Sequence, residues 1–282
     1  MIEGRPHLLN FGCGSALHPE WINLDSSAAA PDVVVHDLRR GLPFPSNSFD
    51  AAYGSHVLEH LEPDAASRLL RECHRILRPG GILRIVVPDL ETIARLYLDS
   101  LERAAAGDTD AAFRYEWMML ELYDQVVRTK SGGNMAMYLR SALGEDHARF
   151  VRSRIGNEAT FGNTSPVEGR SPILRMVRKL RSVTSAARKA IASAFTAVVL
   201  GPEGAAALSE GLFRRSGEVH QWMYDRFSLK RALEDAGFGE VHACSAEDSA
   251  IPGFACYGLE QGNGQERKPD SLYMEGRKPA GA

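Results

Sequence analysis

The stretch Leu8-Leu9-Asn10-Phe11-Gly12-Cys13-Gly14-Ser15-Ala16 joins a short apolar run to a glycine turn near the N-terminus. Its first four residues are mostly apolar and suit a short buried strand, and a turn with two glycines follows at once. Glycines at such a turn let the backbone approach a ligand closely. The dinucleotide fingerprint G-x-G-x-x-G would need a third glycine at Leu17, so a dinucleotide site is disfavoured. Taken alone, the stretch predicts either a nucleotide-binding turn of another kind or a plain tight turn.

The residues that follow alternate short apolar runs with a helix. Further strands are predicted at residues 21–24, 33–35, 49–53 and 82–87. Residues 63–77 predict a helix, because apolar positions recur at helical spacing while arginines take the other side. Pro79-Gly80-Gly81 ends that helix. The alternation predicts an α/β fold, in which helices cover a parallel sheet.

The middle of the chain has a different pattern, mostly helical and interrupted by glycines. We therefore assign residues 1–98 and 216–282 to a sheet domain and residues 99–215 to a helical insertion. From residue 218 the alternation resumes. It predicts a helix that opens at Phe227 with Ser228 as its N-cap, followed by closing strands at residues 241–245 and 272–275.

Two aspartates stand at the ends of successive predicted strands, Asp25 after the second strand and Asp37 after the third. The carboxyl ends of parallel strands meet at one edge of the sheet, where ligands bind. A carboxylate at the second strand can accept from both hydroxyls of a ribose. One at the third can accept from an adenine amino group, while the Leu38 N–H donates to the ring. Each aspartate alone could be a strand-end turn residue, but their order favours a shared site.

Five motifs together resemble class I S-adenosylmethionine-dependent methyltransferases, most closely the type 11 domain, over residues 7–98. These are Leu8 to Gly14; Asp37-Leu38 with Leu42-Pro43-Phe44; Ser48-Phe49-Asp50; Val57-Leu58-Glu59-His60; and Leu77-Arg78-Pro79-Gly80-Gly81. The resemblance implies a Rossmann-like, mostly parallel seven-stranded sheet with a reversed last strand. It also implies S-adenosylmethionine as cofactor, bound over the two glycines. The predicted cofactor-binding residues are Asn10, Gly12, Gly14, Asp25, Asp37, Leu38 and Ser55.

Three features depart from the family pattern. Asn10 stands where the family usually has an acid, and Ala16 stands where a third glycine is common. Gly14 and Asp25 are so close in sequence that the first helix can have two turns at most.

Two histidines are predicted as catalytic bases, which a hydroxyl acceptor or a protonated amine would require. His56 follows the fourth strand, beside the expected methyl group, and His220 lies in the aromatic and polar segment after the insertion. The alternatives are a helix-start histidine packed on the sheet for His56, and core or turn packing for His220. The Glu59-His60 pair also reads as a structural family motif, and Asp89 as the N-cap of a helix at Leu90.

Charge and cysteine content bear on nucleic-acid binding, metal binding and cellular location. The net charge of -3 gives no argument for nucleic acid. The four cysteines lie far apart, no CxxC pair is present, and no metal-binding cluster is evident, so we expect no metal. Scattered cysteines and the absence of an apolar leader favour the cytoplasm.

The insertion carries a basic amphipathic stretch at residues 173–200. It can lie on an anionic membrane at the inner face, or it can cap the site with a solvated basic face; nucleic-acid binding is less favoured, since aromatic residues are scarce there. We expect a methyltransferase whose insertion closes over the acceptor, a small molecule or a glycan precursor of surface-polysaccharide biosynthesis. The alternatives are a non-catalytic S-adenosylmethionine-binding protein and a nicotinamide-dependent oxidoreductase.

Overall fold

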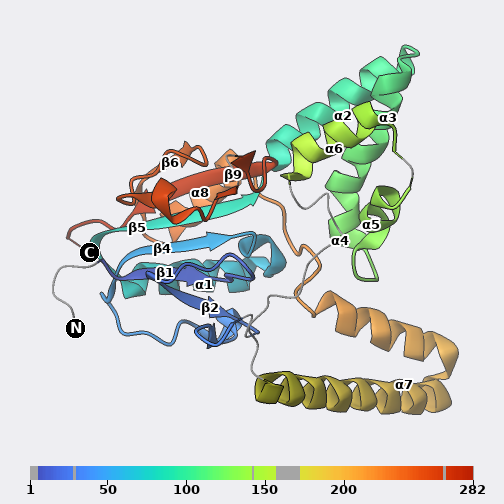
Figure 1. Cartoon of the computed structure of the whole chain (residues 1–282), viewed down its shortest axis with the longest axis horizontal. Helices are drawn as coiled ribbons and strands as arrows, with labels where there is room; N and C mark the ends of the chain where they lie inside the picture. Colours follow the sequence, from blue (N-terminus) through green and yellow to red (C-terminus); the bar gives the residue numbers. More distant parts are fainter. Residues whose placement is uncertain (1–5, 28–29, 142, 157–171, 263–264, 282) are drawn as a thin grey trace.

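A computed structural model describes residues 6–27, 30–141, 143–156, 172–262 and 265–281 (Figure 1). Its centre is a seven-stranded sheet in the order β3-β2-β1-β4-β5-β9-β6. The strands are β1 Leu8–Phe11, β2 Trp21–Asp25, β3 Val34–Val35, β4 Phe49–Ser55, β5 Leu77–Pro88, β6 Gly239–Cys244 and β9 Ser271–Arg277. Strands β1 to β5 pair in parallel, whereas β9 runs antiparallel to both of its neighbours. The predicted sheet with a reversed last strand is therefore confirmed.

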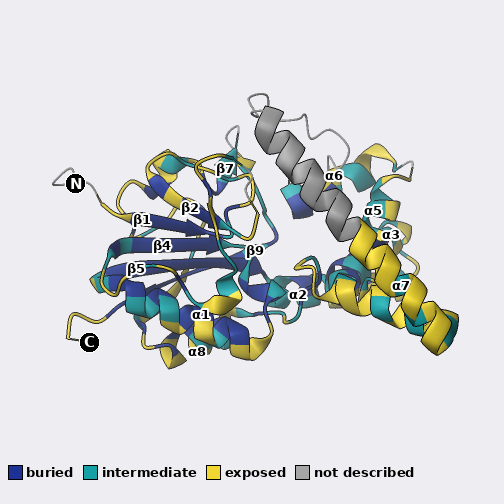
Figure 2. Cartoon of the chain, turned by 90° about the horizontal axis from the view of Figure 1, so that it is seen from below, coloured by how far each residue is buried: buried dark blue, intermediate teal, exposed yellow. Residues whose placement is uncertain are grey.

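One face of the sheet is covered by two helices, α1 (Pro63–Ile76) and α8 (Arg226–Asp235), which Figure 2 shows on the same side. Leu69, Leu70 and Cys73 of α1 pack with Leu229 and Leu233 of α8 in the largest core cluster. Their spacing of three or four residues places them on the inner side of each helix, as the sequence pattern predicts.

The opposite face is covered differently. Between β1 and β2 the described residues 12–20 form turns, so the predicted short first helix is absent. The connection between β6 and β9 fills this place. Trp21 packs edge-on against Phe254 and Tyr257 of that connection, with ring centroids 6.2 and 5.3 Å apart. The connection contains the 3₁₀ turn η5 (Phe254–Tyr257) and the short strands β7 (Gln261–Gly262) and β8 (Gln265–Glu266).

A buried ion pair holds this connection to the sheet. The Arg84 guanidinium of β5 lies 2.8 Å from the Glu275 carboxylate of β9, and neither side chain is exposed to solvent by more than 1%. Arg84 also donates to the Ser245 and Asp248 carbonyls, and Glu275 accepts from the Ala250 N–H. Both charges are therefore paired and hydrogen-bonded, as buried charges need to be.

A helical block lies beyond the carboxyl ends of the parallel strands (Figures 1 and 2). Its helices are α2 Leu90–Ala105, α3 Thr109–Met119, the π turn η3 Leu120–Asp124, α4 Gln125–Val127, α5 Gly133–Leu139 and α6 Glu145–Ile155. The block has its own core around Trp117, Met118 and Val151. Asp89 caps α2 by accepting from the Glu91 N–H, so the block begins at Leu90, earlier than the boundary at residue 99.

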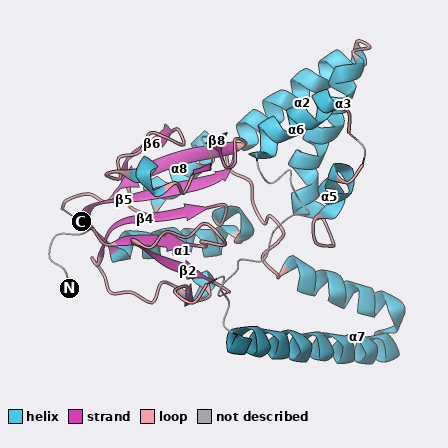
Figure 3. Cartoon of the chain, in the orientation of Figure 1, coloured by secondary structure: helices cyan, strands magenta, loops and turns pink. Residues whose placement is uncertain are grey.

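The last helix of the insertion, α7 (Pro172–Arg214), stands apart from the sheet in Figure 3 and is broken at Gly201. The basic residues expected at 175–181 lie where side chains are not described. Within the described residues, the helical stretch Ala187–Arg214 is long and apolar enough to cross a membrane by length and composition, and none of it is buried.

The helix after the insertion begins one turn earlier than predicted. Its N-cap is Asp225, whose carboxylate accepts from the Phe227 and Ser228 N–H groups. Ser228 is the third helical residue and accepts from the Asp225 N–H, completing a capping box. The prediction of Ser228 as N-cap is therefore wrong, because the stronger acceptor lies three residues upstream.

Candidate functional site

The glycine turn after β1 has the backbone shape that the sequence predicts. Gly12 and Gly14 have φ angles of +64° and +51°, in the left-handed region that other residues rarely adopt. A Cβ on Gly12 would lie 2.1 Å from Cγ2 of Val57, so this position admits no side chain without a shift of its neighbours. Asp25 accepts from the Gly14 N–H at 2.9 Å, which ties the turn to the end of β2.

Asn10, which stands where the family usually has an acid, stabilises the glycine turn through its side-chain amide. Its side-chain amide donates to the Ala16 carbonyl at 2.7 Å and to the Asn23 side chain at 3.0 Å. Two donors of one buried amide thus close the turn from Gly12 to Ala16, which a carboxylate could not do because it only accepts. Asn10 therefore shapes the turn and also lines the cavity beside it.

A cavity of about 240 Å³ lies against this turn, at the carboxyl ends of β1 and β4. It is lined by Asn10, Gly12, Cys13, Gly14, Ser15, Ala16, Tyr53, Ser55, His56, Leu259, Glu260, Arg267 and Lys268. Five predicted site residues are thereby brought together, namely Asn10, Gly12, Gly14, Ser55 and His56. Asp25 reaches the turn from behind, through its bond to Gly14.

The C-terminal connection supplies charged groups to the cavity that the sequence did not single out. Glu260 is buried, and burial raises the pKa of its carboxyl, although a hydrogen bond from the Tyr53 hydroxyl opposes this. Its Oε1 atom has no hydrogen-bond partner among the described residues. Arg267 lines the same cavity and contacts the Leu259 carbonyl at 3.4 Å. The cavity thus holds opposite charges and one buried acceptor available to a ligand.

Asp37 and Leu38 lie at the end of β3, outside the lining of the cavity. The Asp37 carboxylate caps the 3₁₀ turn η1 (Leu38–Arg40) and pairs with the Arg39 guanidinium at 2.8 Å. This hydrogen bond from Arg39 lowers the pKa of Asp37. Leu38 packs at the edge of the main core.

His56 lies at the cavity wall, in a left-handed backbone conformation with φ +52°, unusual for a residue other than glycine. Its Nδ1 atom is 3.3 Å from the Glu59 carboxylate and its Nε2 atom is 2.8 Å from the Ser271 hydroxyl. A hydrogen on Nδ1 facing Glu59 leaves Nε2 as a proton acceptor. The carboxylate thereby orients the imidazole, an arrangement typical of a general base.

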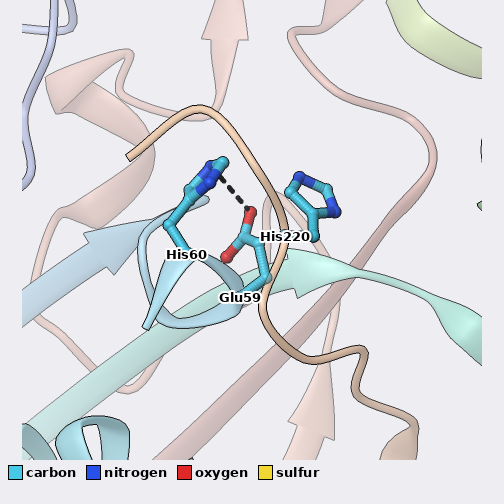
Figure 4. Close-up of side chains that lie close together, drawn as sticks. All are labelled: Glu59, His60 and His220. Carbon is cyan, nitrogen blue, oxygen red and sulfur yellow. Dashed lines mark ion pairs between the residues drawn. The ribbon is translucent and has the colours of Figure 1, made fainter. Parts of the chain in front are cut away.

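His220 lies beside Glu59 (Figure 4) and is not among the residues that line the cavity. Its ring contacts that of His60 edge-on, with centroids 4.8 Å apart. Burial lowers the pKa of His220 to about 3, so its imidazole is neutral. Burial alone would raise the pKa of Glu59, but the contact with the His56 imidazole opposes this most strongly, and the pKa is lowered to about 2. Glu59 is therefore ionised and surrounded by three imidazoles.

Comparison with known proteins identifies the N-terminal half of the sheet. Residues 9–85 match the family model of a methyltransferase domain. This segment is a class I S-adenosylmethionine-dependent methyltransferase domain. The match covers β1 to most of β5, so it includes the glycine turn, Asp25 and His56 of the site just described.

Individual relatives align with the methyltransferase domain or with the fold. A probable methyltransferase, ltbC, of Aspergillus luteorubrus is 32% identical over 84 residues, which are 27% of this chain and 30% of that protein. An S-adenosylmethionine-dependent methyltransferase of Mesorhizobium loti is 30% identical, over 30% of this chain and 48% of its own, with a TM-score of 0.26. A putative methyltransferase in complex with the Haloferax volcanii Trm112 activator is 13% identical, over 99% of this chain and 84% of its own, with a TM-score of 0.41.

The chain thus spans about a third of the length of the curated relative. The helical block and the C-terminal connection lie outside the family match. The cavity residues Glu260 and Arg267 come from that unmatched part, so only the fold of the whole chain brings them to the glycine turn.

Proposed function

We propose that this protein is an S-adenosylmethionine-dependent methyltransferase acting on a small molecule or a glycan precursor. The observation that carries the proposal is the cavity at the carboxyl ends of β1 and β4, whose wall is the glycine turn of a methyltransferase domain. The sheet edge is also where open α/β folds bind ligands.

The residues present fit the cofactor. The cavity of about 240 Å³ is smaller than the roughly 300–1,000 Å³ of typical ligand pockets, and it suits the amino-acid end of the molecule. Glu260 has a buried, unpartnered oxygen for an ammonium group, and Arg267 offers a partner for a carboxylate. Asp25 would hold the ribose, and Asp37 with Leu38 the adenine, on the open surface beyond the turn.

S-adenosylmethionine, when bound, supplies a methyl group that is already activated for transfer. The protein then has to place the acceptor atom and, for a hydroxyl acceptor, remove its proton. His56 is suited to this, because it lines the cavity and its Nε2 atom, the proton acceptor, is held by the short Ser271 side chain. The proton of the acceptor moves to Nε2 while Glu59 holds Nδ1 in place.

The position of the helical block supports an acceptor that binds beneath it, since α2 starts directly after β5 at the cavity edge of the sheet. We assign the block to the acceptor side. A sugar hydroxyl, amine or carboxyl, carried on a nucleotide or a lipid in surface-polysaccharide biosynthesis, is our proposal for the acceptor class. Nucleic acid is disfavoured by the net charge of -3.

The exposed face of α7 supports a location in the cytoplasm at the inner membrane surface. Ile191, Phe195, Val198 and Val199 repeat at helical spacing and are 59–86% exposed, following Arg188 and Lys189. The break at Gly201 leaves the apolar part shorter than the roughly 20 residues that a membrane span needs. We therefore propose peripheral contact with anionic lipid.

Transfer of a labelled methyl group tests the proposed activity. The full chain is incubated with methyl-labelled S-adenosylmethionine and a panel of nucleotide sugars, lipid-linked sugars and small aromatic or amine acceptors. We expect label in one acceptor class and release of S-adenosylhomocysteine in equal amount. If the wild-type chain binds the cofactor but transfers label to no acceptor of the panel, a non-catalytic binding protein would be favoured instead.

A further inference from the structure

A cluster of three side chains lies next to the cofactor cavity without lining it. Glu59 and His60 come from the turn after β4, whereas His220 comes from the segment that follows the insertion. Their nearest nitrogen and oxygen atoms all lie within 4.8 Å of one another (Figure 4). The proposed methyl transfer uses Glu59 only through its contact with His56, so the grouping of all three needs another explanation.

Three polar atoms of the cluster have no hydrogen-bond partner among the described residues. Glu59 is fully buried, and apart from its ion-pair contacts with His56 and His60 neither of its oxygens has a hydrogen bond from the described residues. His220 is 2% exposed, and its Nδ1 atom likewise has no partner there. An unsatisfied buried polar atom costs about 1–3 kcal/mol, so several together indicate a missing ligand.

The orientation of His60 is suited to metal binding. Its Nδ1 atom lies 3.4 Å from the Val219 carbonyl, which favours a hydrogen on Nδ1. The lone pair of Nε2 is then directed at the cluster, where Glu59 lies 3.9 Å away. A carbonyl that fixes the tautomer of a ligating histidine is a common feature of metal sites.

We propose that Glu59, His60 and His220 bind a divalent transition-metal ion such as Zn²⁺. Two imidazoles and one carboxylate are a known ligand set for zinc, and three protein ligands leave a fourth position for water or substrate. Zinc ligands at about 2.0–2.2 Å from the ion lie roughly 3.4 Å from each other in a tetrahedron. The three side chains therefore need only to close in from their present spacing, which small rotations of the side chains provide.

The backbone already holds the two halves of the cluster together. The Gln221 and Trp222 N–H groups both donate to the Glu59 carbonyl, at 2.6 and 3.2 Å, and the His220 N–H donates to the Gln125 carbonyl. The ion would thus bind at a preformed junction between the sheet domain and the helical block. Because His56 contacts Glu59 and lines the cavity, the ion lies one side chain away from the cofactor site.

Titration of the full chain with Co²⁺ after removal of metal by a chelator tests this site, with visible absorption as the readout and Zn²⁺ competition as a check. We expect one ion per chain in the wild type. Glu59→Gln and His60→Gln should each weaken binding at least about a hundredfold, because each removes one of only three ligands. His242→Gln is the matched control, since this exposed histidine on β6 lies outside the cluster and its Nδ1 atom contacts the Glu240 carbonyl of its own strand.

His60 is partly exposed, so His60→Gln is expected to fold, and circular dichroism checks this even if the variant at buried Glu59 does not fold. Lack of Co²⁺ and Zn²⁺ binding by the wild type would overturn the proposal, as would equal binding by all variants. Metal binding is measured without S-adenosylmethionine. A chain that binds only the metal refutes the proposed activity alone, and one that binds only the cofactor refutes this site alone.

Discussion

At the scale of single residues, Gly12 is the position where the site tolerates least change. Gly12→Ala adds a Cβ at 2.1 Å from Val57 and forces a left-handed alanine, which costs about 1–2 kcal/mol. We expect cofactor affinity, measured by calorimetry, to fall at least about tenfold, which corresponds to 1.4 kcal/mol. Gly107→Ala is the control, because Gly107 also has a positive φ but open space around its Cα. Equal affinity in the two variants would show that the turn does not contact the cofactor.

His56 carries the proposed proton transfer. His56→Asn keeps a residue that tolerates a left-handed backbone but removes the base. We expect turnover of a hydroxyl acceptor to fall by roughly 10²–10⁴-fold, while cofactor affinity stays within about twofold of the wild type. Steady-state rates and calorimetry separate the two effects. Full turnover in the variant would remove His56 as the base.

Site residues that lie in short motifs beside a strand could be predicted from the sequence, whereas those contributed by distant segments of the chain could not. Asn10, Gly12, Gly14 and His56 lie in short motifs next to strands, so their positions follow from the strand order. Glu260 belongs to a long connection without regular pattern, and its place depends on the tertiary packing of Phe254 against Trp21. The same holds for the approach of His220 to Glu59, because no local signal joins residues so far apart in sequence.

At the scale of secondary-structure elements, the N-terminus of α8 depends on Asp225. Hydrogen bonds from the Ser228 backbone lower the pKa of the Asp225 carboxyl below its ordinary value. The capping contribution is therefore present above pH 3.8, the ordinary pKa, and is lost as the pH falls through the lowered folded-state pKa.

Asp225→Ala should thus cost about 1 kcal/mol of unfolding free energy at neutral pH and much less at acidic pH. Urea unfolding at both pH values measures this difference. Asp225→Asn is the control, since an asparagine oxygen still caps and should stay within a few tenths of a kcal/mol of the wild type. A deficit of the alanine variant that does not change with pH would contradict the assignment of the cap.

Most elements follow from the periodicity of the sequence, and the exceptions have local causes. The helix predicted at residues 63–77 ends one residue earlier, at Ile76, because Leu77 already pairs with β4. No helix forms in the described residues 12–20, because Asn10 and Asn23 fix that segment as turns through side-chain hydrogen bonds. Side-chain contacts of this kind are invisible to hydrophobic periodicity.

At the scale of the whole molecule, α7 is the surface that sets the proposed location. The double variant Phe195→Glu with Val198→Glu places two acids on the apolar face, where the wild-type side chains are 69% and 86% exposed. We expect the wild type to float with vesicles that contain anionic lipid, and the variant to remain in solution, since both apolar area and electrostatic attraction are lost.

Cofactor binding by the double variant should match that of the wild type, because α7 lies outside the cavity lining. The control is the double variant Glu203→Gln with Glu210→Gln, which changes two side chains of α7 beyond the break at Gly201. Because it removes acids and leaves the apolar face unchanged, it should not reduce flotation. Equal flotation of wild type and acidic variant would contradict membrane contact through this face.

The division of the chain into a sheet domain and a helical insertion stays a prediction, whereas the prediction of Asp89 as the N-cap of a helix at Leu90 is confirmed. Asp89 both ends β5 and caps α2, so the helical block begins directly at the edge of the sheet. This arrangement places the block at the same edge of the sheet as the cavity, which is the basis for assigning it to the acceptor.

Calorimetric titration of the purified full chain with S-adenosylmethionine and with S-adenosylhomocysteine tests whether the glycine turn is a methyl-donor site, with NAD as the comparison ligand. We predict saturable binding of both sulfur ligands at one site per chain, and no binding of NAD, because the turn at Gly12 and Gly14 lacks the third dinucleotide glycine. Binding of NAD without binding of either sulfur ligand would show that the turn is a dinucleotide site instead.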